Sequence, residues 1–296
     1  MITTQSASNS KSLKVEKTSL FLETIQRMLK SPGAKVGTAL FLIIFLACIC
    51  APLIAPYGPN AMDLKNMFSP PSSIHWMGTD GLGRDQLSRL LYGGQYSLFL
   101  GISASVFGAI AGVFIGSIAG YFGGRTETLI MRLMDIWSSI PGMLLCILIS
   151  AVLGAGFFNT VLALSIGGVP EVVRYIRAQI LRERSKEYLE AAEAINCSKF
   201  SIMFRHLLPN VIQPVLVNVT MGIGMVITMA AALSYIGLGV QPPTPEWGAL
   251  LSAGRSHILN YPYLIMFPGL VIAITVFSVN LMGDGLRDAL DPKLRS

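Results

Sequence analysis

Six long apolar stretches constrain this chain more than any other feature of its sequence. A helix needs about 20 mainly apolar residues to cross the hydrocarbon core of a lipid bilayer, and each stretch reaches that length. The stretches comprise residues 36–55, 98–122, 129–153, 160–180, 211–236 and 263–282. Because a helix satisfies its backbone hydrogen bonds internally, it is stable inside a bilayer. We therefore predict an all-α, polytopic membrane protein with six transmembrane helices.

The charges agree with a membrane protein and predict its orientation. Only 13% of the residues are charged, and this excludes an ordinary soluble enzyme, in which about 25% carry charge. Lys and Arg of short loops are retained on the cytoplasmic side. If the N-terminus is inside, all but four of the 22 Lys and Arg lie at the inner face, which explains the net charge of +6 without a nucleic-acid partner. We therefore expect both termini to be cytoplasmic; the exceptions are Lys65, Arg84, Arg89 and Arg255.

No motif in the sequence indicates catalysis, a metal or a bound cofactor. The phosphate-binding pattern GxxxxGK[ST] is absent, as are the hydrolase patterns HExxH and GxSxG. The four cysteines and three histidines are scattered, and the one close pair, Cys48 and Cys50, lies alone in a predicted lipid-embedded helix. An intramembrane enzyme would need a catalytic pair at depth, which is not evident. We expect a protein that is not an enzyme and holds no cofactor.

Composition and turn residues divide the chain into segments. Residues 1–30 are polar and basic and are expected to form a cytoplasmic N-terminal segment. Residues 31–94 hold the first transmembrane helix and an outer segment, in which four prolines exclude a long helix. Residues 95–290 are expected to form a five-helix core with a cytoplasmic loop at 181–210, and residues 291–296 a cytoplasmic tail.

Glycine recurs at every fourth position of the second apolar stretch, at Gly108, Gly112, Gly116 and Gly120. This spacing places bare backbone on one face of a helix, where another helix can approach closely. Close packing matters in lipid because no hydrophobic force drives helices together there. The pattern predicts a packing helix and leaves open whether its partner belongs to the same chain.

Charged residues also occur inside the predicted helices, at Asp135, Glu171 and Arg174. Such residues mark ion or proton pathways in membranes, so a self-sufficient secondary transporter or channel is the alternative function. Asp135 follows Arg132 by three residues, and Glu171 precedes Arg174 by three, so each acid can pair on its own helix face. We favour local pairing, because a secondary transporter would show an inverted repeat around a midplane site.

The cytoplasmic loop carries the strongest functional signal. Its first half consists of helix formers, with Leu189, Ala192 and Ile195 at three-residue spacing on one face. Glu190 beside Ala191 combines a carboxylate that can pair with a partner's arginine and a small side chain that permits close docking. The pattern predicts a short cytoplasmic helix that docks against another protein.

The end of this short helix is also readable. Asn196 fits a helix end, because asparagine tolerates the left-handed conformation better than most residues. A second helix is expected to start at about Ser198, to run to Leu208 and to stop at Pro209.

These residues resemble the inner-membrane permeases of ATP-binding-cassette importers. In that family the loop reads EAA, then a glycine four residues after the second alanine, then LP. Asn196 replaces the glycine here. The resemblance implies that the loop forms a coupling helix seated in a cleft of a separate ATPase subunit. The residues expected to couple are Glu187, Glu190, Ala191, Ala192, Ala194, Asn196, Leu208 and Pro209.

Three further signatures resemble the second, C-type permease of oligopeptide and dipeptide importers. They are HWMGTDGLGRDQLSRLLYGG at 75–94, QPPTPEWGALLS at 241–252 and NLMGDGLRDALDPKLR at 280–295. The resemblance implies the type I ABC importer permease fold in the bacterial inner membrane. It also implies a second homologous permease that completes the pore, two cytoplasmic ATP-binding subunits that hold ATP and Mg, and an extracytoplasmic solute-binding protein. Nickel and metallophore importers share this subunit type, so the cargo stays open.

Two outer segments admit a docking role and a structural one. Residues 78–85 are rich in Gly, Asp and Arg, and fit either a contact for a substrate-delivery protein or a structured outer loop. Residues 241–252 fit either a docking surface or an anchor at the membrane interface, where Trp247 would be favourable.

Overall fold

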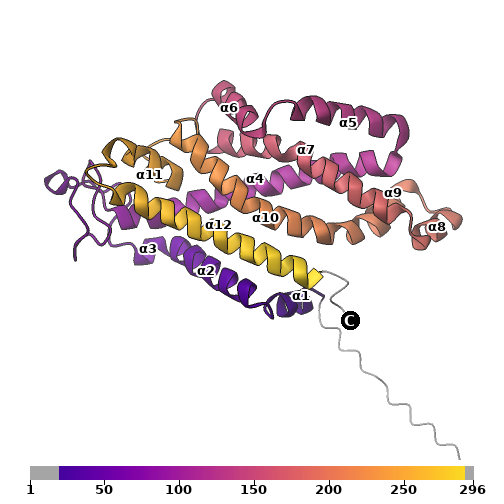
Figure 1. The fold of residues 1–296 in the computed structure, drawn as a ribbon, viewed down its shortest axis with the longest axis horizontal. Helices are drawn as coiled ribbons and strands as arrows, with labels where there is room; N and C mark the ends of the chain where they lie inside the picture. Colours follow the sequence, from indigo (N-terminus) through magenta and orange to yellow (C-terminus); the bar gives the residue numbers. More distant parts are fainter. Residues whose placement is uncertain (1–19, 291–296) are drawn as a thin grey trace, which may run out of the picture.

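The structure, a computed structural model, describes residues 20–290 and is built from helices (Figure 1). This part of the chain contains no strand, and its one β contact is an isolated bridge between Thr79 and Asp85. The predicted all-α class is confirmed. The elements are α1 (Leu20–Met28), α2 (Pro32–Ile49), α3 (Ala51–Ile54), η1 (Leu64–Asn66), α4 (Gln86–Phe122), α5 (Gly124–Ser138), α6 (Gly142–Leu153), α7 (Phe157–Arg184), α8 (Glu187–Ala194), α9 (Lys199–Ser201), η2 (Ile202–Leu207), α10 (Leu208–Tyr235), α11 (Trp247–Gly254), η3 (Arg255–His257) and α12 (Tyr263–Leu290).

Within residues 20–290, four continuous helices are long and apolar enough to cross a membrane. They are α2, α4, α12 and the run Lys199–Tyr235, which joins α9, η2 and α10. The bent pair of α5 and α6 gives a fifth span if it is counted as one. Helix α7 is as long as α10 and α12, but its polar residues, among them Asn159, Glu171 and Arg174, lower its hydropathy below that of the others. The long helices run lengthwise in one elongated bundle (Figure 1).

The third predicted span, 129–153, is broken rather than continuous. Helix α5 ends at Ser138, α6 begins at Gly142, and their axes differ by 81°. Pro141 accounts for the break, because a proline disfavours the helical conformation of the residue before it and Pro141 itself has φ −52° and ψ 132°. The expectation of one continuous helix is therefore wrong. The bend leaves space between α6, α7 and α10.

The second span lies in a helix that begins at Gln86, well before residue 98. The turns of α4 before residue 98 pack against α11 and not against lipid. Hydropathy therefore does not identify them as part of this helix. Gly93 of α4 lies against Pro245, and Trp247 Nε1 donates to the carbonyl oxygen of Leu90 at 2.9 Å. Trp247 is 0% exposed. An interfacial anchor at Trp247 is therefore ruled out, because its indole lies in the core of the protein.

The glycine stripe of α4 faces α7 of the same chain. A Cβ atom at Gly112 would lie 2.5 Å from Val172 Cβ, and one at Gly116 would lie 2.8 Å from the carbonyl oxygen of Val173. Favourable carbon contacts lie at about 3.5–4.0 Å, so only glycine permits this approach. The two helices are held nearly backbone to backbone along the bundle.

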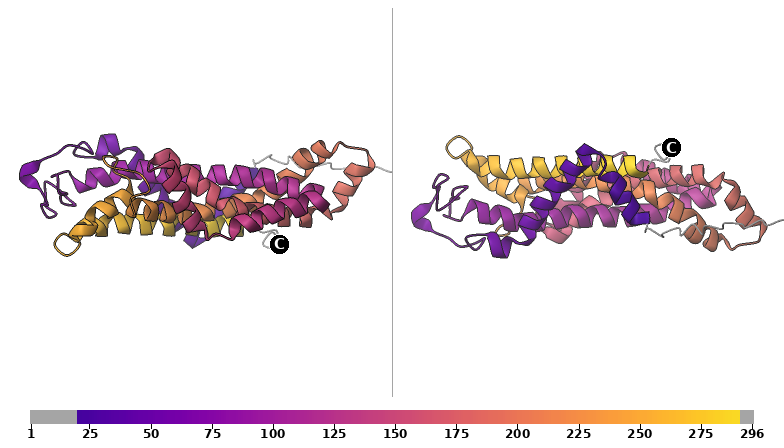
Figure 2. Two further views of the ribbon diagram at one scale, coloured as in Figure 1. Left: turned by 90° about the horizontal axis from the view of Figure 1, so that it is seen from above. Right: turned by 90° about the horizontal axis from the view of Figure 1, so that it is seen from below.

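Helix α2 packs against α12 and α4, and α1 and α2 lie across the bundle when it is seen from below (Figure 2). Gly37 brings α2 so close to α12 that a Cβ atom would lie 2.8 Å from the carbonyl oxygen of Ser278. Ala34 fits against Gly285 of α12, and Cys48 against Gly94 of α4. Helix α2 is therefore packed closely against α12 and α4 along its length.

Candidate functional site

The loop at 181–210 folds into α8 and α9 at the end of the bundle opposite α11 (Figure 1). Helix α8 follows α7 after a short turn, and the chain returns through α9 and η2 into α10. The short helix predicted from the sequence is therefore present. Helix α8 is therefore connected along the chain to α7 on one side and, through α9 and η2, to α10 on the other.

One face of α8 belongs to the hydrophobic core of the chain itself. Leu189 and Ala192 are 3% and 6% exposed, and they cluster with Ile202, Met203 and Leu207 from the returning segment. Ala192 was expected to touch a partner, but its side chain points into this cluster. Its small size permits α8 to lie close to η2, and a direct contact with a partner stays a prediction.

The opposite face of α8 is acidic and exposed. Glu187, Glu190, Ala191 and Ala194 all face the surroundings. Among the residues that the structure describes, no hydrogen bond or ion pair engages Glu187 or Glu190. Two carboxylates on one exposed helix face are therefore free to meet basic groups of another protein.

Exposed apolar residues occur in the same loop. Ile195, Phe200 and Phe204 are 77%, 68% and 48% exposed, and the two phenylalanine rings stack with their centroids 5.8 Å apart. An apolar patch rimmed by polar groups is typical of a protein interaction site. We call this surface the inner patch, and its residues are Glu187, Glu190, Ala191, Ala194, Ile195, Phe200 and Phe204.

Asn196 has the conformation that its sequence position predicts. Its φ of +58° is left-handed, and the N–H of Cys197 donates to the carbonyl oxygen of Ala192 at 3.1 Å. This is the hydrogen bond that closes a helix end through a left-handed residue. Asparagine thus forms the left-handed turn at this helix end.

The helix after Asn196 was predicted to stop at Pro209, but it continues past this residue. Ser198 caps its start by accepting from the N–H of Ser201 at 3.3 Å. The residues Ile202–Leu207 then form a π-helix that continues into α10, with Pro209 in its first turn. Pro209 thus lies inside the continuous run Lys199–Tyr235, directly after a π-helical turn in which the usual i to i−4 hydrogen bonds are already replaced, so its missing N–H is tolerated there. Leu208 and Pro209 therefore join the loop to α10 and do not end it.

Three residues that the sequence did not single out hold α8 in place. Glu183 is 8% exposed and accepts from Lys186 Nζ and from the Tyr188 hydroxyl, each at 2.8 Å. Asn210 Nδ2 donates to the Tyr188 oxygen at 3.1 Å. Burial raises the pKa of Tyr188, and the hydrogen bond to Glu183 raises it further. The network ties α8 to the end of α7 and the start of α10; the contact between Asn210 and Tyr188 joins residues 22 apart, which sequence spacing does not predict.

Acids of α5 pair with arginines of α7. Arg174 Nη2 donates to Asp135 Oδ1 at 3.1 Å, and Arg177 Nε donates to Glu127 Oε1 at 2.6 Å. The local pairs predicted for Asp135 and Glu171 are therefore wrong, because the neighbouring helix offers Arg174 a partner. Glu171 has no hydrogen-bonding or charged partner in the described part of the chain.

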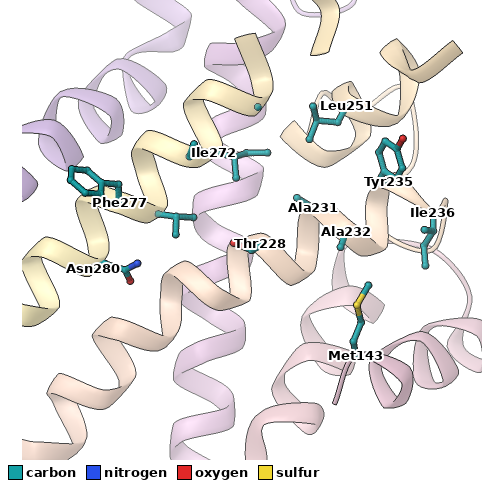
Figure 3. A pocket seen from close by; sticks show the side chains of 13 residues that line it. Met143, Thr228, Ala231, Ala232, Tyr235, Ile236, Leu251, Ile272, Phe277 and Asn280 are labelled. Atoms are coloured by element: carbon teal, nitrogen blue, oxygen red, sulfur yellow. The ribbon is translucent and has the colours of Figure 1, made fainter. Parts of the chain in front are cut away.

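Two cavities lie along α10. The larger, of about 710 Å³, is an open and largely apolar space between α10 and α12, with Thr228 and Asn280 among its few polar groups (Figure 3). The smaller, of about 450 Å³, lies between α4, α6, α7 and α10, and it contains Glu171 and Asn218. Helix α10 therefore separates an open apolar surface from a smaller cavity that contains a carboxylate and a carboxamide.

The outer turn at 78–85 is held by its own charges. Asp80 accepts from Arg84 Nε at 2.7 Å. Asp85 lies 3.0 Å from His75 Nδ1 and caps α4 by accepting from the N–H of Ser88 at 2.8 Å. These contacts support a structured outer loop, and docking of another protein there stays a prediction.

Residues 112–296 match the family described as binding-protein-dependent transport system inner membrane component. Residues 19–71 match a second family, described as the N-terminal TM domain of oligopeptide transport permease C. The first match covers more than half of the chain and includes α8, the inner patch, the α10 and α12 walls of the larger cavity, and the α6, α7 and α10 walls of the smaller one.

Relatives of nearly equal length are similar along almost the whole chain. The di/tripeptide transport system permease protein DppC of Pseudomonas aeruginosa is 42% identical over 92% of this chain and 91% of its own. The probable D,D-dipeptide transport system permease protein DdpC of Escherichia coli is 40% identical, over 90% of both. The glutathione transport system permease protein GsiD of Shigella flexneri is 46% identical over 87% of this chain and 86% of its own.

Solved structures share the fold at lower identity. The MetNI methionine ABC transporter in an inward-facing conformation aligns with a TM-score of 0.56 and 19% identity, over 68% of this chain and 96% of that chain. An amino acid ABC transporter aligns with a TM-score of 0.52 and 16% identity, over 66% and 91%.

Proposed function

Because the chain belongs to the family of binding-protein-dependent transport system inner membrane components, we propose that it forms half of the pore of a peptide importer. It is an ABC transport permease and a multi-pass protein of the bacterial inner membrane. The relatives are named for di- and tripeptides, D,D-dipeptides and glutathione. Peptides of two or three residues are therefore the cargo class that we assign to this chain.

We assign six spans to the chain, with α7 as the one that composition does not identify. Its charged side chains support this assignment, because Arg174 and Arg177 pair with α5 and Glu171 lines a cavity. Charges that face protein or a cavity are tolerated within a membrane. Residues 1–30 and 291–296 are then cytoplasmic, residues 31–94 hold the first helix and outer segment, and residues 95–290 form the core. Of these, 1–19 and 291–296 lie outside the described residues.

The inner patch is the proposed coupling site. The observation that carries this proposal is the free acidic face of α8, in a loop that also exposes two aromatic rings, on a helix tied to α7 and α10 through Tyr188. Two separate ATPase subunits would bind ATP and Mg and would hold α8 in a cleft. A second permease would complete the pore, and a binding protein would deliver the solute from outside.

Coupling then requires no chemistry in this chain. ATP favours the closed form of the paired ATPases, so it shifts the population of states in which the pore opens outward or inward. Movement of the cleft displaces α8, and the hydrogen bonds of Glu183 and Asn210 to Tyr188 carry that displacement into the long helices.

The test is a charge reversal on the exposed face of α8. Glu190→Lys places a positive charge where a basic cleft is expected, and like charges at an interface cost several kcal/mol. We expect loss of ATPase co-purification and of ATP-driven uptake in reconstituted vesicles, with the helices still folded. Asn196→Gly is the control, since glycine adopts the left-handed turn readily. Full uptake by Glu190→Lys would show that the inner patch does not couple.

A further inference from the structure

The smaller cavity beside α10 contains polar groups that neither helix packing nor the inner patch uses. Its volume of about 450 Å³ falls within the range of about 300–1,000 Å³ that is typical of small-molecule sites. Four helices enclose it, and one of them, α6, begins at the bend after Pro141. The cavity therefore lies where a broken span leaves room inside the bundle.

Glu171 lies near the middle of the membrane-crossing length. It is the fifteenth residue of the 28-residue helix α7, which places it about 21 Å from the outer end of that helix at about 1.5 Å per residue. Its neighbour Val172 packs against Gly112 of α4. A carboxylate at such depth is costly unless it faces a polar cavity or a partner, and Glu171 faces the cavity.

Two polar side chains of the cavity have no partner within the described residues. The two arginines on the same helix, Arg174 and Arg177, are paired with acids of α5. Glu171 is exposed, and in residues 20–290 it makes no ion pair or hydrogen bond. Asn218 of α10 lines the same cavity and has no hydrogen-bond partner among these residues either. A carboxylate and a carboxamide thus share one space with no internal partner.

Two glycines keep the cavity open. Gly168 of α7 and Gly222 of α10 both line it, and a Cβ atom at either position would meet nothing within 4 Å. The glycines of α4, by contrast, are required by the approach of α7. Glycine within a helix is unfavourable by about 1 kcal/mol relative to alanine. No close packing contact requires glycine at Gly168 or Gly222. Glycine at these positions instead leaves the cavity open.

The remaining wall is adaptable. Met221, Met225 and Met229 line the cavity at four-residue spacing, so they form one stripe along α10. Methionine side chains are flexible and polarizable, and they fit surfaces of differing shape. The cavity therefore joins one fixed polar end to one wall that can fit different apolar groups.

We propose that this cavity is a transient binding site for the cargo, in which Glu171 binds the ammonium group of a passing peptide. Asn218 hydrogen-bonds to the first peptide unit, and the methionine stripe accommodates the variable side chains. A charge-assisted hydrogen bond from an ammonium group to a carboxylate is the strongest contact that these residues can offer. The site rests on the proposed function, since it presumes that peptides cross this chain.

The test uses the complete importer, reconstituted with its second permease, ATPases and binding protein, and trialanine as the probe. Glu171→Gln keeps the shape of the side chain and removes its charge. Because a hydrogen bond to a charged group is worth more than a neutral one, we expect trialanine uptake to fall by about tenfold or more. Assembly and the ATPase activity stimulated by the loaded binding protein should stay at wild-type levels. Asp284→Asn is the matched control, an exposed acid of α12 outside the cavity, and should leave uptake unchanged.

A second variant tests the space without the charge. Gly222→Leu places an apolar side chain in the cavity, since a Cβ atom there meets nothing within 4 Å, and should lower trialanine uptake at normal complex yield. Wild-type uptake by Glu171→Gln would overturn the proposal. Loss of the second permease from purified Glu171→Gln would also overturn it and would assign Glu171 to the subunit contact. Failure of the wild-type importer to take up trialanine would instead refute the proposed peptide cargo.

Discussion

The close contact between α4 and α7 predicts opposite effects for two glycine-to-alanine substitutions. At Gly116 a new Cβ atom would lie 2.8 Å from both Ile176 Cβ and the carbonyl oxygen of Val173. At Gly168 the same atom would meet nothing within 4 Å. Both positions are inside helices, so both substitutions gain the same helix propensity, about 1 kcal/mol. The difference between them isolates the cost of the helix contact.

The size of that difference follows from the geometry. Carbon atoms pack at about 3.5 Å or more, so α7 would have to move away from Gly116 by about 0.7 Å. Overpacking of this kind costs about 1–3 kcal/mol. A change of 1 kcal/mol shifts the melting temperature of a chain of this size by about 2–4 °C. We therefore expect Gly116→Ala to melt about 2–12 °C below Gly168→Ala.

The measurement is the fraction of purified importer that stays monodisperse in detergent after heating through a temperature series. Wild type should melt above Gly116→Ala and at or slightly below Gly168→Ala. Equal melting temperatures for the two variants would show that α4 and α7 are not held at backbone distance. Gly116→Leu should then be tolerated as well, which the present packing excludes.

Two further predictions concern orientation and the anchoring of α8. In intact cells a thiol probe should label Lys65→Cys and Leu259→Cys but not Lys199→Cys. Leu259 is 92% exposed, so a probe can reach it. Labelling of position 199 from outside would contradict the proposed orientation. Because burial and Glu183 raise the pKa of Tyr188, its hydrogen bond should contribute fully below the ordinary value of 10.0 and be lost as pH rises through the higher folded-state value. The tyrosinate absorbance of wild type minus Tyr188→Phe should show a midpoint above 10.0, and a midpoint at or below 10.0 would contradict this assignment.

Features that depend on neighbours in sequence were predictable. Apolar stretches of bilayer length predict an all-α membrane protein because each helix satisfies its own backbone groups. The short helix of the loop at 181–210 and the turn at Asn196 followed from local propensity, and the structure contains both. These are short-range properties, since a few adjacent residues decide them whatever the rest of the chain does.

Features that depend on contacts between distant residues were decided by the tertiary structure alone. Arg174 pairs with Asp135 because α5 folds against α7, although Glu171 is nearer in sequence. Trp247 is buried because α11 covers the first turns of α4, whereas the sequence left open a docking surface or an anchor at the membrane interface. Because Arg174 pairs with Asp135, the carboxylate of Glu171 has no partner among the described residues. Whether an acid inside a membrane has a partner depends on which helix packs beside it. The spacing of residues along the sequence does not determine that packing.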